Sequence, residues 1–177
     1  IEPAPRGTAS VVGLAAVALR HRDPQAIMAI LPSDHYIRNS DLFRYVLREA
    51  LDVANKGYLV TLGITPVSPS SAYGYIQQGS PLEENLKYPV YRAERFTEKP
   101  DEKTTQTFLR SRQHSWNSGM FVWRADVILG EIERQKADAV ADASAVEPER
   151  PISLDAPAPA VVLGDEALLR QILGNLV

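Results

Sequence analysis

The sequence predicts an α/β fold in which a mostly parallel sheet is covered by helices on both faces. Residues 8 to 65 alternate between segments with helical apolar spacing and short apolar runs, which gives the order helix, strand, helix, strand. The runs 26–31 (AIMAIL) and 58–65 (YLVTLGIT) are apolar almost throughout, as expected of strands buried on both sides. With 177 residues, 45% of them hydrophobic, the chain can bury one such core.

Two helices are predicted in the first third of the chain. The first begins at Thr8, whose hydroxyl can cap it, and ends before Pro24. The second is capped by Ser40 and stops at Gly57. Its apolar side chains form one helical stripe: Leu42, Phe43, Val46, Leu47, Ala50, Leu51 and Ala54.

The remaining elements are shorter and less regular in pattern. In chain order, the sequence predicts a loop rich in Pro and Ser at 65–79, a strand or hairpin arm at 88–98, a helix at 101–111, a strand at 120–123 and a helix at 125–135. Asp101 is the expected cap of the third helix.

Beyond Gln135 the composition shifts toward Ala, Pro, Val and Asp. The alternation in PISLD and AVVLG suggests a short β-hairpin around a Pro-Ala turn, followed by an amphipathic helix to the end. We therefore divide the chain into residues 1–135 and a tail of residues 136–177.

Composition and charge bound the function classes. A net charge of −3 gives no overall electrostatic reason to bind nucleic acid or an anionic membrane. The chain has no cysteine, which excludes thiolate chemistry and fits a reducing compartment. No apolar run approaches the roughly 20 residues that span a bilayer, and we expect a cytoplasmic protein. Because it opens with Ile1, we expect a fragment or a processed form.

Asp34 follows the first predicted strand, within ILPSDHYI. Ligands of open α/β sheets bind beyond the carboxyl ends of the strands. A carboxylate at such an end is suited to hold Mg²⁺, which takes oxygen ligands and shares them with substrate phosphates. The alternative is that Asp34 only caps a turn through its own backbone amides.

Three further stretches carry candidate binding residues. Gly74 lies between two tyrosines in SAYGYIQQG, where backbone can approach a ligand and aromatic rings can line a sugar site. Glu98 and Lys99 stand side by side in FTEKP and could serve hydroxyls and a phosphate, although neighbours on a strand point to opposite sides and need not pair. Asn117 leads into a strand in HSWNSGMF. An ordinary glycine turn, an exposed charge pair and a turn Asn remain the respective alternatives.

The motifs of several other site types are missing. The sequence contains no G-x-S-x-G, no G-x-G-x-x-G and no G-x-x-x-x-G-K-[ST], and its three histidines have no zinc-ligand spacing. A hydrolase elbow, a dinucleotide fingerprint, a P-loop and a zinc site are therefore not indicated.

Five blocks, in this order and spacing, resemble the bacterial mannose-1-phosphate guanylyltransferases, also called GDP-mannose pyrophosphorylases. They are EPAPRGTA (2–9), LPSDHYI (31–37), VTLGITPVSPSSAYGYIQQG (60–79), FTEKPD (96–101) and WNSGMFVWRAD (116–126). The resemblance covers residues 1 to about 135. It implies a Rossmann-like nucleotidyltransferase fold that makes GDP-mannose and pyrophosphate from GTP and mannose 1-phosphate with Mg²⁺, and homo-oligomers are possible.

The resemblance also implies roles for single residues. Asp34 would be a Mg²⁺ ligand and Lys99 would hold the sugar phosphate. The hexose would be held by Glu98, Asn117 and the Gly74 backbone. Arg6 and Thr8 lie in the block associated with the nucleotide base.

The sequence also departs from the family pattern. It contains neither the Gly-rich triphosphate loop nor the second metal-binding Asp of the family, and RGTAS replaces the usual Arg-Asn-Thr-Ala-Pro. Ser71 stands where Thr is usual. We therefore expect weak or no turnover from this chain, with a catalytically dead sugar-phosphate or nucleotide-binding module as the alternative.

The tail resembles the start of a sensor histidine kinase ATP-binding domain, with Asn175 matching the first Asn of its Mg²⁺-binding motif. No phosphoacceptor His region and no ATP lid accompany it. We expect a chimera joined near residues 135 to 138, and a kinase-derived ATP-binding fragment is a third hypothesis.

Overall fold

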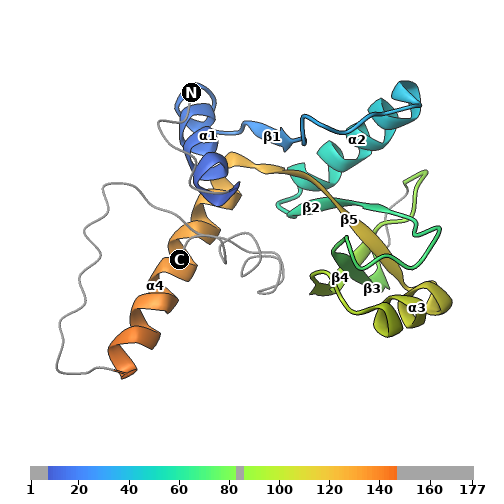
Figure 1. Cartoon of the computed structure of the whole chain (residues 1–177). Helices are drawn as coiled ribbons and strands as arrows, with labels where there is room; N and C mark the ends of the chain where they lie inside the picture. The colour runs from blue at the N-terminus through green and yellow to red at the C-terminus, as the bar shows by residue number, and fades with distance from the viewer. Residues whose placement is uncertain (1–7, 83–85, 147–177) are drawn as a thin grey trace.

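A computed structural model describes residues 8–82 and 86–146 (Figure 1). Arg6, the predicted hairpin and closing helix of the tail, and Asn175 lie outside these residues. The elements, in chain order, are α1 Thr8–Arg22, β1 Ile27–Ile30, α2 Ser40–Asn55, β2 Val60–Ile64, β3 Tyr75–Pro81, β4 Tyr91–Thr97, α3 Glu102–Ser111, β5 His114–Arg124 and α4 Ala125–Val146. None of the described helices combines the length and the apolar character needed to cross a membrane.

The sheet is organised around the long strand β5. Strands β1, β2 and β3 each pair with β5, and β4 pairs with β3. Every one of these pairings is antiparallel, so the prediction of a mostly parallel sheet is wrong for the described strands. Strands β1 and β2 do run in the same direction, but the later strand β5 lies between them.

Helices cover both faces of the sheet, as predicted. Phe121 and Trp123 of β5 belong to a core cluster that includes side chains from α1 and α4. The intervening residue, Val122, packs instead with Ala50 and Ala54 of α2. Because successive strand residues point to opposite faces, this alternation places α1 and α4 on one face and α2 on the other (Figure 1).

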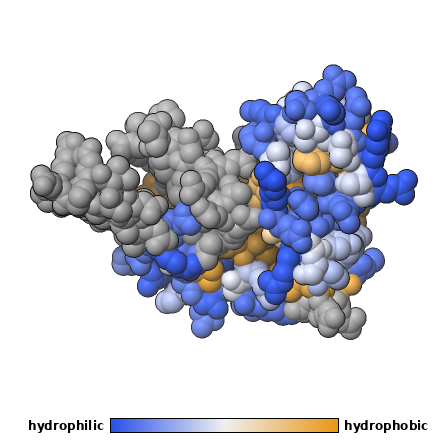
Figure 2. Space-filling view, turned by 90° about the horizontal axis from the view of Figure 1, so that it is seen from below, coloured by the Kyte–Doolittle hydropathy of each residue, from blue (hydrophilic) through white to orange (hydrophobic). Residues whose placement is uncertain are grey.

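Figure 2 shows one face of the molecule. Figure 2 shows a mostly hydrophilic face with small, separate hydrophobic areas between the described residues. Scattered apolar side chains of this kind are normal on folded proteins.

The ends of the helices follow local chemistry with one correction. Asn39, not Ser40, is the N-cap of α2, because its side-chain oxygen accepts a hydrogen bond from the Leu42 amide at 3.0 Å. The same helix stops where Gly57 takes a φ of +91°, which glycine adopts without strain.

The structure differs from the predicted ranges at three elements. Strand β5 begins at His114, although only 120–123 was predicted as a strand. Strand β3 occupies Tyr75–Pro81, in a segment predicted mainly as a loop. Helix α4 runs to Val146 and so passes through the predicted boundary at residue 135. The division into two domains remains a prediction.

Asp101 caps α3, as predicted, and makes the cap sensitive to pH. Its carboxylate accepts a hydrogen bond from the Thr104 amide at 2.7 Å, and this bond holds the pKa of Asp101 below its ordinary value. A lowered folded-state pKa adds stability above the unfolded-state pKa, about 3.9, and this stability is lost as the pH falls through the folded-state pKa.

We expect Asp101→Asn to be less stable than the wild type at pH 7 and equal to it once the pH falls below the folded-state pKa. Asparagine can still cap the helix, so the comparison isolates the charge. Urea unfolding between pH 7 and pH 2 measures the difference, with Asp101→Ala showing the loss of the whole cap. A difference that stays constant over this range would contradict the prediction.

Candidate sugar-phosphate site

The middle strand β3 brings two of the predicted binding residues into contact. Tyr75 pairs with Trp116 of β5. One residue before β3 begins, the Gly74 carbonyl accepts a hydrogen bond from the Asn117 amide at 2.8 Å. Gly74 and Asn117 therefore lie directly side by side, at the end of the sheet where β3 begins.

Glu98 joins them from the other side of β3. Tyr75 pairs with Thr97 of β4, so the residue after Thr97 reaches the level of Gly74. The three candidates Gly74, Glu98 and Asn117 thus sit in one row across three neighbouring segments, although 43 positions separate the first from the last in the chain.

Lys99 turns back toward Glu98 as β4 ends. Its backbone takes a φ of +40°, and its ammonium nitrogen lies 3.6 Å from a Glu98 carboxylate oxygen. The two side chains were not required to pair on a regular strand, but the left-handed backbone at Lys99 takes it out of the strand. Both side chains remain substantially exposed, which leaves them accessible to a ligand.

Asn117 lies within strand β5, not in the turn that was the alternative. The stretch from Asn117 to Gly119 forms a bulge, because four residue steps along β5 match two steps along β2 between the pairs Thr61–Phe121 and Gly63–Asn117. Such bulges re-aim side chains next to binding sites.

Hydrogen bonds within the bulge fix the Asn117 side chain. Its oxygen accepts a hydrogen bond from the Gly119 amide at 3.1 Å, and Gly119 has a φ of +69°. The Ser118 hydroxyl donates to the Leu62 carbonyl of β2. With the oxygen engaged in this way, the amide nitrogen of Asn117 is the donor end of the side chain.

Asp34 lies in an exposed turn after β1. The ring of Pro32, at the start of this turn, comes within 3.5 Å of the position that a Cβ would take at Gly119. The turn therefore packs next to the bulge that carries Asn117. Among the described residues, no group of three or more acidic or histidine side chains could hold a metal ion.

The two tyrosines around Gly74 have different environments. Tyr73 is half exposed, and its ring lies 5.0 Å from that of Trp116, centroid to centroid. Tyr75 is only 1% exposed and packs against Phe108 of α3. The expectation that both rings could line a sugar site is therefore wrong for Tyr75.

Thr8 is not part of this row of residues. It is exposed at the first turn of α1, and Figure 1 shows α1 and the β3–β4 pair at opposite ends of β5.

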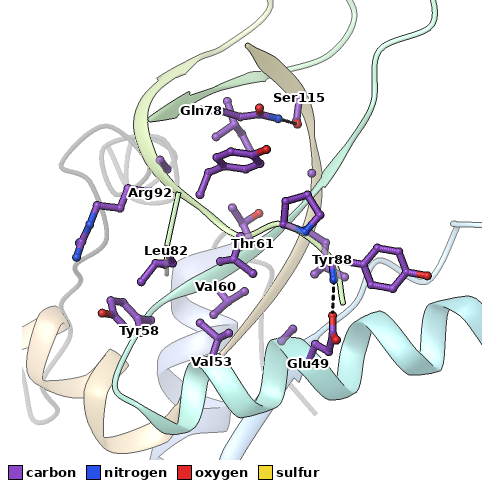
Figure 3. Close-up of a pocket in the computed structure, with 18 of the residues that line it drawn as sticks. Glu49, Val53, Tyr58, Val60, Thr61, Gln78, Leu82, Tyr88, Arg92 and Ser115 are labelled. Carbon is purple, nitrogen blue, oxygen red and sulfur yellow. Dashed lines mark hydrogen bonds between the residues drawn. The ribbon is translucent and has the colours of Figure 1, made fainter. Parts of the chain in front are cut away.

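A cavity of about 620 Å³ lies elsewhere, between α2, β2 and the β3–β4 pair (Figure 3). On one side of this cavity, Glu49 of α2 binds the segment before β4. Its carboxylate accepts hydrogen bonds from the Lys87 and Tyr88 amides at 2.8 and 3.2 Å. None of the candidate residues lines this cavity.

The comparison with known proteins identifies the family of this chain. Residues 1–146 match the family described as nucleotidyl transferase, and the chain belongs to that family. A mannose-1-phosphate guanylyltransferase of Klebsiella pneumoniae is 42% identical over 78% of this chain and 29% of its own length. The mannose-1-phosphate guanylyltransferase of Escherichia coli K12 is 38% identical over 84% of this chain and 32% of its own length.

A solved structure from Thermus thermophilus, named mannose-1-phosphate geranyltransferase, has a TM-score of 0.68 at 28% identity and covers 85% of this chain and 43% of that one. The chain thus spans about 30% of the length of the curated relatives named above.

Proposed function

We propose that this chain carries the sugar-phosphate half of a nucleotidyl transfer site, whose reaction converts GTP and mannose 1-phosphate to GDP-mannose and pyrophosphate. The observation that carries the proposal is the row of Gly74, Glu98 and Asn117 across adjacent segments, with Lys99 at its edge. The guanylyltransferase names of the relatives support the choice of substrates.

Each residue in the row suits one part of a hexose phosphate. The Lys99 ammonium provides a point charge for the phosphate, and the Glu98 carboxylate can accept hydrogen bonds from sugar hydroxyls. The amide nitrogen of Asn117 can donate to another hydroxyl, and Gly74 has no side chain to block the ring. Lys99 and Glu98 neutralise each other before binding, so a phosphate would compete with Glu98 for the ammonium.

The proposed reaction needs alignment more than a protein nucleophile. An oxygen of the sugar phosphate attacks the α-phosphorus of GTP, a new P–O bond forms, and the bond to the leaving pyrophosphate breaks. Catalysis of this kind depends on positioning and on neutralising charge. Holding the sugar phosphate in one orientation would therefore be the contribution of Lys99, Glu98 and Asn117.

A Mg²⁺ ion fits this site if Asp34 is one of its ligands. The ion commonly takes one or two carboxylates and completes its shell with water and substrate phosphates. The exposed Asp34 offers one carboxylate, in the turn whose Pro32 lies next to the bulge of β5. When bound, the ion would neutralise charge on the transferring phosphoryl group.

One observation favours a second candidate, a sugar-phosphate binding module without transfer activity. In the part of the chain that the structure describes, Asp34 has no cluster of further acidic or histidine ligands around it. Binding of a sugar phosphate would then need only Lys99 and the row of Gly74, Glu98 and Asn117.

Pyrophosphate release tests the first candidate against the second. Incubating the chain with GTP, mannose 1-phosphate and Mg²⁺ should give pyrophosphate and GDP-mannose in equal amounts if it is a transferase. Leaving out mannose 1-phosphate is the control for GTP hydrolysis. Saturable mannose 1-phosphate binding with no GDP-mannose would favour the binding module, and failure of both would overturn the proposal.

A further inference from the structure

Tyr75 is buried, yet its hydroxyl is used for a contact within the loop that precedes β3. The hydroxyl oxygen lies 3.1 Å from the Ser70 amide nitrogen and 3.1 Å from the Ser70 carbonyl oxygen. It accepts a hydrogen bond from the first and donates one to the second. One phenol thus satisfies both backbone polar groups of a single loop residue.

The position of this hydroxyl is set by the surrounding fold. The Tyr75 backbone is paired on both sides, with Thr97 and with Trp116. Its ring packs at 5.3 Å from Phe108 of α3, centroid to centroid. Phe108 is stacked in turn on His114 at 3.9 Å. Because the Tyr75 backbone is paired at both edges and its ring packs on α3, the hydroxyl is presented in one place.

The loop that the hydroxyl holds is the one that enters the candidate site. Residues 70–74 are fixed at one end by the two bonds between Ser70 and the Tyr75 hydroxyl. At the other end they are fixed by the bond that the Asn117 amide donates to the Gly74 carbonyl. Between these points lies Tyr73, whose half-exposed ring packs against the ring of Trp116. The loop therefore carries both the glycine and the exposed ring that would face a hexose.

The geometry points to Tyr75 as a positioning residue, whose hydroxyl closes loop 70–74 and so sets Tyr73 and Gly74 against the sugar. This inference rests on the proposed function, because it concerns the affinity for a sugar phosphate. Tyr75 does not touch the ligand itself. The hydroxyl orders the loop before the ligand binds, and so reduces the conformational entropy that binding costs.

Tyr75→Phe removes both hydrogen bonds and keeps the ring. We expect the affinity for mannose 1-phosphate to fall by about 3- to 30-fold, as for the loss of one to two hydrogen bonds. Affinity for inorganic phosphate, which has no hexose to contact the loop, should stay within about 2-fold. Titrations followed by ¹H–¹⁵N NMR measure both constants. If Tyr75→Phe only disturbed the fold, the affinities for mannose 1-phosphate and for inorganic phosphate would fall together.

Ser70→Ala is the matched control. It deletes the Ser70 hydroxyl, which accepts a bond from the Ala72 amide at 3.3 Å, but it leaves both backbone bonds to Tyr75. This variant should lose clearly less affinity for mannose 1-phosphate than Tyr75→Phe, because both bonds to the Tyr75 hydroxyl still close the loop. An equal loss in Ser70→Ala and Tyr75→Phe would overturn the inference.

Hydrogen exchange in the wild type tests the closed loop without any substitution, in case Tyr75→Phe folds poorly. The Ser70 amide should exchange more slowly than the neighbouring Ser71 amide, and fast exchange at Ser70 would overturn the inference. If the wild type does not bind mannose 1-phosphate, the proposed function fails and this inference fails with it. If the wild type binds and Tyr75→Phe binds equally well, only the inference fails.

Discussion

Lys99→Ala should weaken mannose 1-phosphate binding by about 10- to 100-fold, the range expected when a charged hydrogen bond to a phosphate is lost. The fold should be unaffected, because the Lys99 side chain is 65% exposed and an exposed ion pair contributes little stability. Isothermal titration measures the affinity, and urea unfolding checks the fold.

Lys103→Ala is a suitable control for the loss of one positive charge. Lys103 is an exposed lysine on α3, outside the row of candidate residues. Its replacement should leave the affinity nearly unchanged at about 0.15 M salt, because salt screens the exposed charge of a lysine that does not contact the ligand. Equal weakening by the two substitutions would show that only net charge matters, and would remove Lys99 from the site.

Trp123→Ala should reduce the free energy of unfolding by about 3–5 kcal/mol, the range for truncating a buried aromatic residue. Trp123 is 1% exposed and its ring lies 5.4 Å from that of Phe121, centroid to centroid. It belongs to the core cluster that joins β5 to α1 and α4. Urea unfolding gives the free energy, read from the shift in the transition midpoint at constant slope.

Trp123→Phe separates the volume of this side chain from its polar atom. The indole nitrogen of Trp123 is buried and has no hydrogen-bond partner in the part of the chain that the structure describes, so its removal relieves an unsatisfied donor. Phenylalanine also keeps most of the ring packing. The loss should therefore be clearly smaller than for alanine. Equal losses would contradict this account of the core.

Much of the fold could be predicted because its signals are local. Helical spacing identified α1 and α2, the apolar runs gave β1 and β2, and Asp101 marked the start of α3. The direction of strand pairing could not be predicted in this way. It depends on β5, which enters the sheet from far along the chain, and no local pattern specifies where a strand inserts.

The sequence predicted only residues 120–123 of strand β5, and the reason lies in the residues before them. The sequence Asn117-Ser118-Gly119 has the composition of a turn, but in the sheet the same residues form a bulge that continues the strand. A bulge and a turn use the same residue types, and only the pairing with β2 distinguishes them.

The candidate site was found by resemblance more than by chemistry. Taken singly, Gly74, Glu98 and Asn117 each allowed an ordinary turn or surface position, and the register of three neighbouring segments is what brings them together. The bonds of the Tyr75 hydroxyl to Ser70 and the ring contact of Trp116 with Tyr73 were not predicted, because they depend on tertiary packing. The metal role of Asp34 and the base contacts of Arg6 and Thr8 remain predictions.

Titration of the wild-type chain with mannose 1-phosphate, mannose and inorganic phosphate tests the central claim most directly. A site built from Glu98, Asn117 and Lys99 should bind mannose 1-phosphate saturably, and more tightly than either mannose or phosphate alone. Equal affinity for mannose 1-phosphate and inorganic phosphate, or no saturable binding of mannose 1-phosphate, would contradict the account.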